Sequence, residues 1–207
     1  LEALREVGPA GPKNEHYLTR VIEILRGQGG RVASVAAANP EEILGINTRL
    51  QLASVDRILG RRTLERLMLS GTTIIDPGHT YVDATVDVGP DVTLLPGTLL
   101  KGKTTVGRGS RLGPYTFIED CALGADVEVR MSYMHGAKVG DGAMIGPFSH
   151  VRPGSLIGAK ARVGNFSEIK ASKIGAGAKV PHLSYIGDAE LQENVNIGAG
   201  TIPCNFD

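Results

Sequence analysis

The sequence predicts a mainly β domain wound as a parallel β-helix, preceded by a connector helix and a segment of α/β character. From Val88 to Ile197 aliphatic residues recur every five or six positions, and all 20 positions of that register hold Val, Leu, Ile or Met. The chain of 207 residues also has 28 Gly, no Trp, four Phe and five Tyr. Such a period suits a triangular coil with one short strand and one inward aliphatic side chain per side, turned by Gly at its corners.

The segment before the repeats predicts the end of an α/β domain. We expect a short helix at 1–7, and a second helix through 17–25, where apolar residues recur at helical spacing. A run of small and branched residues predicts a strand at 32–37. These elements together assign residues 1–49 to the end of an α/β domain.

A second amphipathic helix is expected over 47–69, and residues 50–70 form the linker to the repeats. Its apolar stripe consists of Leu50, Leu52, Val55, Ile58, Leu59, Leu64, Leu67 and Met68. The β-helix then occupies residues 71–207.

The repeat itself fixes how the coils stack. Of its 19 intervals, 14 are six residues and five are five residues, so we expect a tightened corner or a bulging loop at the short steps and near 133–137. Three hexapeptides make one coil, and parallel pairing stacks the coils about 4.8 Å apart. We expect roughly six coils, and further coils after residue 207, because an uncovered parallel edge invites pairing.

Composition excludes several classes of partner. Lys and Arg number 22 and Asp and Glu also number 22, so no global field attracts nucleic acid or an anionic membrane. Cys121 and Cys204 have neither C-x-x-C nor zinc-finger spacing, which predicts free thiols. No apolar stretch approaches the roughly 18 residues of a membrane span, and residues 1–20 lack the pattern of a signal peptide. We therefore expect a cytoplasmic protein with no membrane span.

Most charged side chains on a β-helix are solvated, but one group falls on three consecutive coils and can share one rim. Its members are Arg152, Lys170, His182, Tyr185, Asn196 and Asn205. Acyl transfer from a thioester to an amine needs a general base, donors for the oxyanion, and a cationic cradle if the acceptor carries phosphate. The residue types in this group match those needs.

His182 is the natural base, since a histidine side chain ordinarily changes charge at about pH 6.5, and Glu168 from the preceding coil is expected to orient its ring. Arg152 and Lys170 would bind a phosphate, the Arg as a fork and the Lys as a point charge. Tyr185 offers a neutral hydrogen bond to a sugar hydroxyl.

Asn196 is expected to bind the sugar as well, and Asn205 with the backbone N–H groups of 198–200 would face the acetyl group. From the residues alone, His182 can equally be a surface histidine at a corner. Cys204 is an alternative nucleophile, although transfer from a thioester to a sugar amine needs no covalent intermediate.

Five segments give the chain a specific resemblance: GINTRLQLA at 45–53, RPG at 152–154, GNFSEIK at 164–170, HLSYIGDAE at 182–190 and NVNIGAGTI at 194–202. The chain resembles the bifunctional enzymes that acetylate glucosamine 1-phosphate with acetyl-CoA. Those enzymes then uridylylate the product to UDP-N-acetylglucosamine for the cell envelope. The likeness extends over essentially the whole chain.

The resemblance implies a left-handed β-helix in a homotrimer, with His182 as the catalytic base. It gives the sugar-phosphate contacts as Arg152, Lys170, Tyr185 and Asn196. It places Ala199, Asn205 and Phe206 at the acetyl-CoA site. It makes residues 1–49 the remnant of a uridylyltransferase domain, in which Asn47 helps to hold Mg²⁺ and the UDP-sugar.

The sequence departs from the family at two positions, Phe206, where members usually have Tyr, and Pro203, where they have a small residue. The lost hydroxyl at 206 puts a hydrogen bond to CoA in doubt. The nucleotide loop of the family lies upstream, so we expect no uridylylation by this chain. We also expect little or no acetylation, and turnover of glucosamine 1-phosphate at a rate comparable to the intact enzyme would refute that.

Two alternatives remain open. A carbonic anhydrase on the same fold needs three histidines on zinc, and His135, His150 and His182 lack its usual close pair. A β-helix can also be a non-enzymatic oligomerisation module, which has no need of the clustered polar residues. Zinc analysis tests the first alternative, and a His182→Ala variant of the intact protein tests the second.

Overall fold

The computed structural model describes residues 1–204 and divides the chain into two compact units, Leu1–Gly45 and Ile46–Asp207. Each unit has its own internal contacts and is described by itself. None of the helices within residues 1–204 has the length and apolarity needed to cross a membrane.

The first unit holds three short helices. α1 spans Glu2–Arg5, α2 spans Arg20–Gly27 and the 3-10 helix η1 spans Pro40–Ile43. Both predicted α-helices are therefore confirmed, and they pack on each other. The strand predicted over 32–37 is wrong, because that segment is exposed and pairs with none of the described strands. Without a neighbouring strand its backbone groups have no ladder to join.

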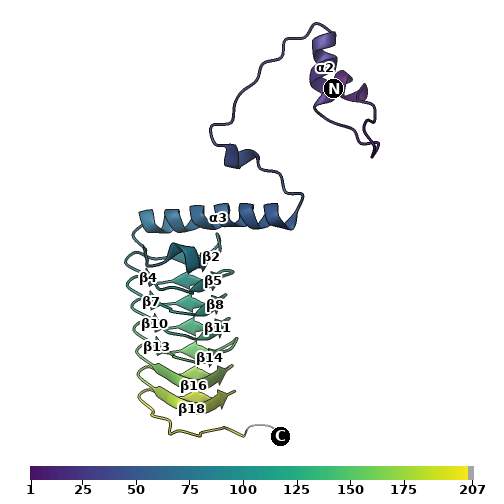
Figure 1. Cartoon of the computed structure of the whole chain (residues 1–207). Coiled ribbons are helices and arrows are strands. Elements are labelled where there is room, and N and C mark those ends of the chain that lie inside the picture. Colours follow the sequence, from purple (N-terminus) through teal and green to yellow (C-terminus); the bar gives the residue numbers. More distant parts are fainter. Residues whose placement is uncertain (205–207) are drawn as a thin grey trace. The chain divides into compact units, whose positions relative to one another are not determined.

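The second unit is a parallel β-helix capped by α3, and this predicted fold is confirmed (Figure 1). Its three sides are called faces A, B and C.

Face A consists of β1 (Thr73–Ile74), β4 (Thr93–Leu94), β7 (Arg111–Leu112), β10 (Glu128–Val129), β13 (Met144–Ile145) and the first parts of β16 (Arg162–Lys170) and β18 (Lys179–Gly187). Face B consists of β2 (Tyr81–Val82), β5 (Leu99–Lys101), β8 (Phe117–Glu119), β11 (Tyr133–His135), β14 (His150–Val151) and the last parts of β16 and β18. Face C consists of β3 (Asp87–Val88), β6 (Thr105–Val106), β9 (Ala122–Leu123), β12 (Lys138–Val139), β15 (Leu156–Ile157), β17 (Lys173–Ile174) and β19 (Glu190–Leu191).

The aliphatic register points inward as predicted. Its members from Val88 to Ile186 are all buried in one core, and Leu191 and Ile197 pack against that core while remaining partly exposed. Within the described residues there are seven coils rather than six, because face C alone has seven strands. Only the first two inward residues of the first coil, Ile74 and Val82, lie outside the predicted register, because the 3-10 helix η2 (Pro77–His79) lengthens the step between them.

α3 spans Arg49–Leu69 and lies across the end of the stack where the first coil begins (Figure 1). It starts with a capping box, in which Thr48 accepts from the N–H of Gln51 and the Gln51 side chain accepts from the N–H of Thr48. Leu64 and Leu67 are buried over the first coil. Most of the predicted stripe in the N-terminal half of α3 remains exposed, so only its later turns close the core.

A second buried layer, which the sequence analysis did not identify, lies two residues before each inward aliphatic. Under face B every member of this layer is a hydroxyl residue: Thr80, Thr98, Thr116, Ser132, Ser149, Ser167 and Ser184. Their hydroxyls bond corner backbone, as Thr98 does to Leu95 O at 2.7 Å. These hydroxyls donate hydrogen bonds to backbone carbonyls at the corners, which stabilises the backbone conformation beneath face B.

The five-residue steps are tightened corners, as expected, and no loop bulges near 133–137, where β11 runs along face B. Four of these steps join face B to face C. At each, one residue turns the chain with a positive φ: Asp120, Gly136, Ala171 and Asp188. The last two of these corners border the candidate site.

Candidate functional site

Face B brings polar residues from three coils into one column. The parallel register places His150 beside Glu168 and Glu168 beside Tyr185. Arg152 and Lys170 each lie at the edge where face B turns toward face C, just after an inward aliphatic residue. The prediction that neighbouring coils bring Arg152, Lys170 and Tyr185 together therefore agrees with the geometry.

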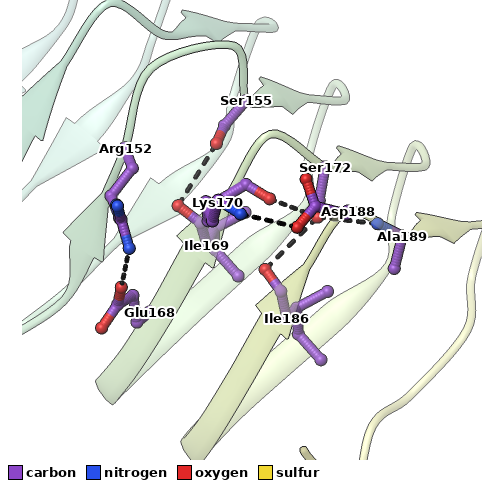
Figure 2. A network of polar contacts seen from close by, with 9 residues as sticks. All are labelled: Arg152, Ser155, Glu168, Ile169, Lys170, Ser172, Ile186, Asp188 and Ala189. Carbon is purple, nitrogen blue, oxygen red and sulfur yellow. Dashed lines mark hydrogen bonds and ion pairs between the residues drawn. The ribbon is translucent and has the colours of Figure 1, made fainter. Parts of the chain in front are cut away.

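Two ion pairs cross this edge (Figure 2). Arg152 Nη1 donates to Glu168 Oε1 at 2.9 Å, and Lys170 Nζ donates to Asp188 Oδ2 at 2.8 Å. We call Arg152, Glu168, Lys170, Tyr185 and Asp188 the edge cluster. Its two cations and two carboxylates give it no net formal charge, so a bound anion would add negative charge to balanced pairs.

The pKa of Lys170 is raised above its ordinary value, mainly by the hydrogen bond and the charge of Asp188. Tyr185 acts in the same direction, whereas burial and the positive charge of Arg152 act against it. Lys170 is therefore a full cation at neutral pH, which suits a contact to phosphate.

Gly187 leaves the space that the Tyr185 ring occupies. A Cβ at 187 would lie 2.6 Å from Cζ of Tyr185 and 2.7 Å from its Cε1, so the ring lies over the bare glycine. The Tyr185 ring thus extends along face B toward the edge where Lys170 lies, in register with Gly187. Sequence reasoning missed Gly187, although its position two residues after a predicted site tyrosine was a usable signal.

His182 lies elsewhere on the coil. It is exposed, it stands beside Asn165 where face A turns into face B, and its ring makes no hydrogen bond to the rest of the described chain. The register partner of Glu168 is Tyr185, which follows His182 by three residues. Glu168 is therefore displaced from His182 by about 10 Å along the strand. The expected pairing of Glu168 with His182 is therefore not made within one chain, and Glu168 bonds Arg152 instead.

The other predicted site residues are spread out. Asn196 bridges Lys179 on face A, and Ala199 is exposed at the following corner. Asn205 and Phe206 lie outside the described residues. Asn47 precedes α3, and its backbone N–H donates to the side chain of Gln51 at 2.8 Å.

An open groove of about 420 Å³ lies over face B and the corner that precedes it, and His182 is not among its lining residues. Phe148 and Phe166 form one wall as a stacked pair with ring centroids 5.4 Å apart. The rest of the groove is lined by His150, Ser167, Glu168, Leu183, Ser184, Tyr185 and Ile202. The groove therefore presents apolar surface next to hydrogen-bonding groups, as ligand sites commonly do.

The zinc alternative finds no support in the geometry of one chain. No group of three or more His, Cys, Asp or Glu in residues 1–204 is placed to hold a metal ion. His150 instead packs edge-on against Tyr133, with centroids 5.3 Å apart. Cys121 is buried and Cys204 is exposed, and both are free thiols as predicted.

Residues 136–171 match the family described as bacterial transferase hexapeptide (six repeats). This match and the seven stacked parallel coils define a hexapeptide-repeat β-helix protein.

Over its whole length the chain is 44% identical to the "Bifunctional protein GlmU" of Geobacillus sp. (strain WCH70) and covers 45% of that protein. It is 46% identical to the protein of the same name from Streptomyces avermitilis and covers 43% of it. The resemblance to bifunctional enzymes drawn from the sequence is thus confirmed, and the chain spans less than half the length of these relatives.

A solved structure with a weaker likeness is a point mutant of GDP-perosamine N-acetyl transferase from Caulobacter crescentus, in complex with CoA and GDP-perosamine. It is 19% identical, with a TM-score of 0.38 over 87% of this chain and 70% of the other.

Proposed function

We propose that the β-helix transfers an acetyl group from acetyl-CoA to the amine of glucosamine 1-phosphate. The observation that carries this proposal is the edge cluster, in which Arg152, Lys170 and Tyr185 from three coils converge on one edge. Two adjacent cations and a phenol suit a sugar phosphate, and a surface used only as a spacer needs no such group. The identity to bifunctional relatives over the whole chain supports the same reaction.

In this reaction the amine nitrogen attacks the thioester carbonyl, the carbon–sulfur bond breaks, and CoA leaves as a thiol. His182 accepts the proton that the amine loses and returns it to the departing sulfur. Its exposed ring has no competing hydrogen-bond partner in the described chain. Backbone N–H groups near Ala199 are candidates to bind the acetyl-CoA, with Asn205 and Phe206 beyond them.

We further propose that the site is completed between copies in a homotrimer. In glucosamine 1-phosphate the amine and the phosphate sit on adjacent carbons, whereas His182 and the edge cluster occupy opposite edges of face B. His182 of a second copy would place the base next to the edge cluster of the first copy. Exposed apolar side chains at the same corner, Tyr115, Phe148, Phe166 and Leu183, form a surface that self-association would cover.

The intact protein would pair this step with uridylyl transfer from UTP in the cytoplasm. That step gives UDP-N-acetylglucosamine, and Mg²⁺ would be bound with the help of Asn47. This part rests on the relatives named bifunctional, of which the chain spans less than half the length. Among the residues that the structure describes, no group of three or more His, Cys, Asp or Glu is placed to hold a metal ion.

The test is a His182→Ala variant of the intact protein, assayed for both transfers. Acetylation should fall by a factor of about 10² to 10⁴, the usual contribution of a general base, while uridylylation persists. His79→Ala is the matched control, because His79 is an exposed histidine on the first coil, bonded to Asp76. Retained acetylation by His182→Ala would favour the spacer interpretation, and stoichiometric zinc in the purified protein would favour the anhydrase.

A further inference from the structure

The carboxylate of Asp188 stands directly at the phosphate-binding edge, although neither the residue pattern nor the resemblance gave it a role. Its Oδ2 accepts from Lys170 Nζ at 2.8 Å, and both side chains are partly exposed. Figure 2 shows the two residues facing each other from successive coils. Asp188 is thus the partner that defines where the Lys170 ammonium lies.

The backbone of Asp188 is fixed independently of this ion pair. Asp188 turns the corner with φ of +50°, and its N–H donates to Lys170 O at 3.0 Å. Ser172 donates to the same carbonyl at 2.8 Å and accepts from the N–H of Ala189 at 3.1 Å. Asp188 is therefore the anchored member of the pair, whereas Lys170 has a flexible four-carbon stem.

Arg152 and Lys170 lie on successive coils, so two positive charges stand close together before any ligand arrives. The Arg152 charge acts on Lys170 directly. Like charges at this spacing repel and would drive a mobile ammonium toward solvent. The carboxylates of Glu168 and Asp188 offset that repulsion, each bonded to one cation.

We propose that Asp188 is a positioning residue, which holds the Lys170 ammonium beside Arg152 and Tyr185 so that the phosphate site is assembled before the sugar phosphate binds. This inference rests on the proposed function of the edge cluster. The electrostatic alternative is that the Asp188 carboxylate simply repels the phosphate. The two effects predict opposite changes when the charge of Asp188 is removed.

The decisive variant is Asp188→Asn in the intact protein, because asparagine tolerates the positive φ and keeps the shape of the side chain. Positioning predicts a rise of about three- to fivefold in KM for glucosamine 1-phosphate, the scale expected of one exposed ion pair. kcat and the KM for acetyl-CoA should not change. Repulsion predicts a lower KM instead.

Asp120→Asn is the matched control. Asp120 turns the equivalent corner four coils earlier, also with φ of +50°, and it accepts from the N–H of Lys103 at 2.8 Å. It lies away from Arg152 and Lys170, so its variant should keep the KM of the wild type. Asp188→Gly, which also tolerates a positive φ, replaces Asp188→Asn if the latter unfolds.

A double-mutant cycle with Lys170→Met separates positioning from a general loss of structure. If Asp188 acts through Lys170, Asp188→Asn adds nothing in the Lys170→Met background, and acetylation of phosphate-free glucosamine is unaffected by either change. Equal losses with and without Lys170, or an unchanged or lowered KM, would overturn the inference.

Binding of glucosamine 1-phosphate measured by calorimetry supplies a readout without turnover. A Kd for glucosamine 1-phosphate that is about three- to fivefold higher in Asp188→Asn than in the wild type supports the positioning role, even if chemistry is slow. Equal binding by both proteins overturns the positioning role alone. A wild-type protein that binds no sugar phosphate overturns the proposed function and the positioning role together.

Discussion

Ser172 supports the corner beneath the edge cluster, and removing its hydroxyl tests how much that corner depends on it. The side chain is buried, its one hydroxyl hydrogen faces Lys170 O at 2.8 Å with Ile186 O as a longer alternative at 3.3 Å, and its oxygen accepts from the N–H of Ala189 at 3.1 Å. In Ser172→Ala the Ala189 N–H loses its acceptor, while the Lys170 carbonyl still accepts from Asp188. The main loss is thus the acceptor of one partly buried N–H, together with the longer contact to Ile186 O.

Such a group costs about 1–3 kcal/mol, so we expect Ser172→Ala to lower the free energy of unfolding by about 2 kcal/mol. For a chain of 207 residues this corresponds to a fall in Tm of about 4–8 °C. Thermal unfolding followed by circular dichroism measures it, at one fixed protein concentration because self-association also raises Tm.

Ser54→Ala is the control for that experiment. Ser54 lies exposed on α3, where its hydroxyl donates only to Leu50 O within the same helix, and alanine favours the helix. Its Tm should not fall. If Ser172→Ala melts within about 1 °C of the wild type, the Ser172 hydroxyl does not hold the corner between faces B and C.

Gly187→Ala should raise the KM for glucosamine 1-phosphate, because a Cβ at position 187 displaces the Tyr185 ring. The expected rise is about fivefold, which corresponds to the loss of one neutral hydrogen bond. Steady-state kinetics measures this, and an unchanged KM would contradict it. Native alkylation followed by peptide mapping should label Cys204 within minutes and spare Cys121, since burial raises the pKa of the Cys121 thiol; equal labelling would refute its burial. Because that pKa is raised in the folded state, its contribution to stability is complete below the ordinary thiol pKa and is lost as pH rises through the raised value. Gly60→Ala in α3 should raise the free energy of unfolding by about 1 kcal/mol, because nothing lies within 4 Å of the added Cβ; a lowered denaturation midpoint would contradict this.

The core was predictable because the six-residue register depends only on spacing. Each inward residue from Val88 to Ile186 is buried as expected. Ile74 and Val82 of the first coil were not in the predicted register, because η2 interrupts the spacing between them. The buried hydroxyls beneath face B also escaped, since serine and threonine look like ordinary surface residues until the coil turns them inward.

The candidate site was predictable in its members but not in its contacts. Counting coils correctly placed Arg152 near Lys170, because three six-residue repeats make one full coil and return the chain to the same side. It misplaced Glu168 relative to His182, since counting coils ignores the position of a residue along its side. Asp188 was overlooked because an aspartate after a glycine resembles a turn residue, which it also is.

The coil, its inward residues, the residue types of an acyl-transfer site and the resemblance to bifunctional sugar-nucleotide enzymes can all be read from the amino-acid sequence. All of these follow from order and spacing along the chain. The pairing of the charges, Glu168 with Arg152 and Asp188 with Lys170, becomes known only from the folded structure. The reason is physical: side chains from different coils meet through parallel registry and corner geometry, and a shift of one residue at a corner exchanges the partners.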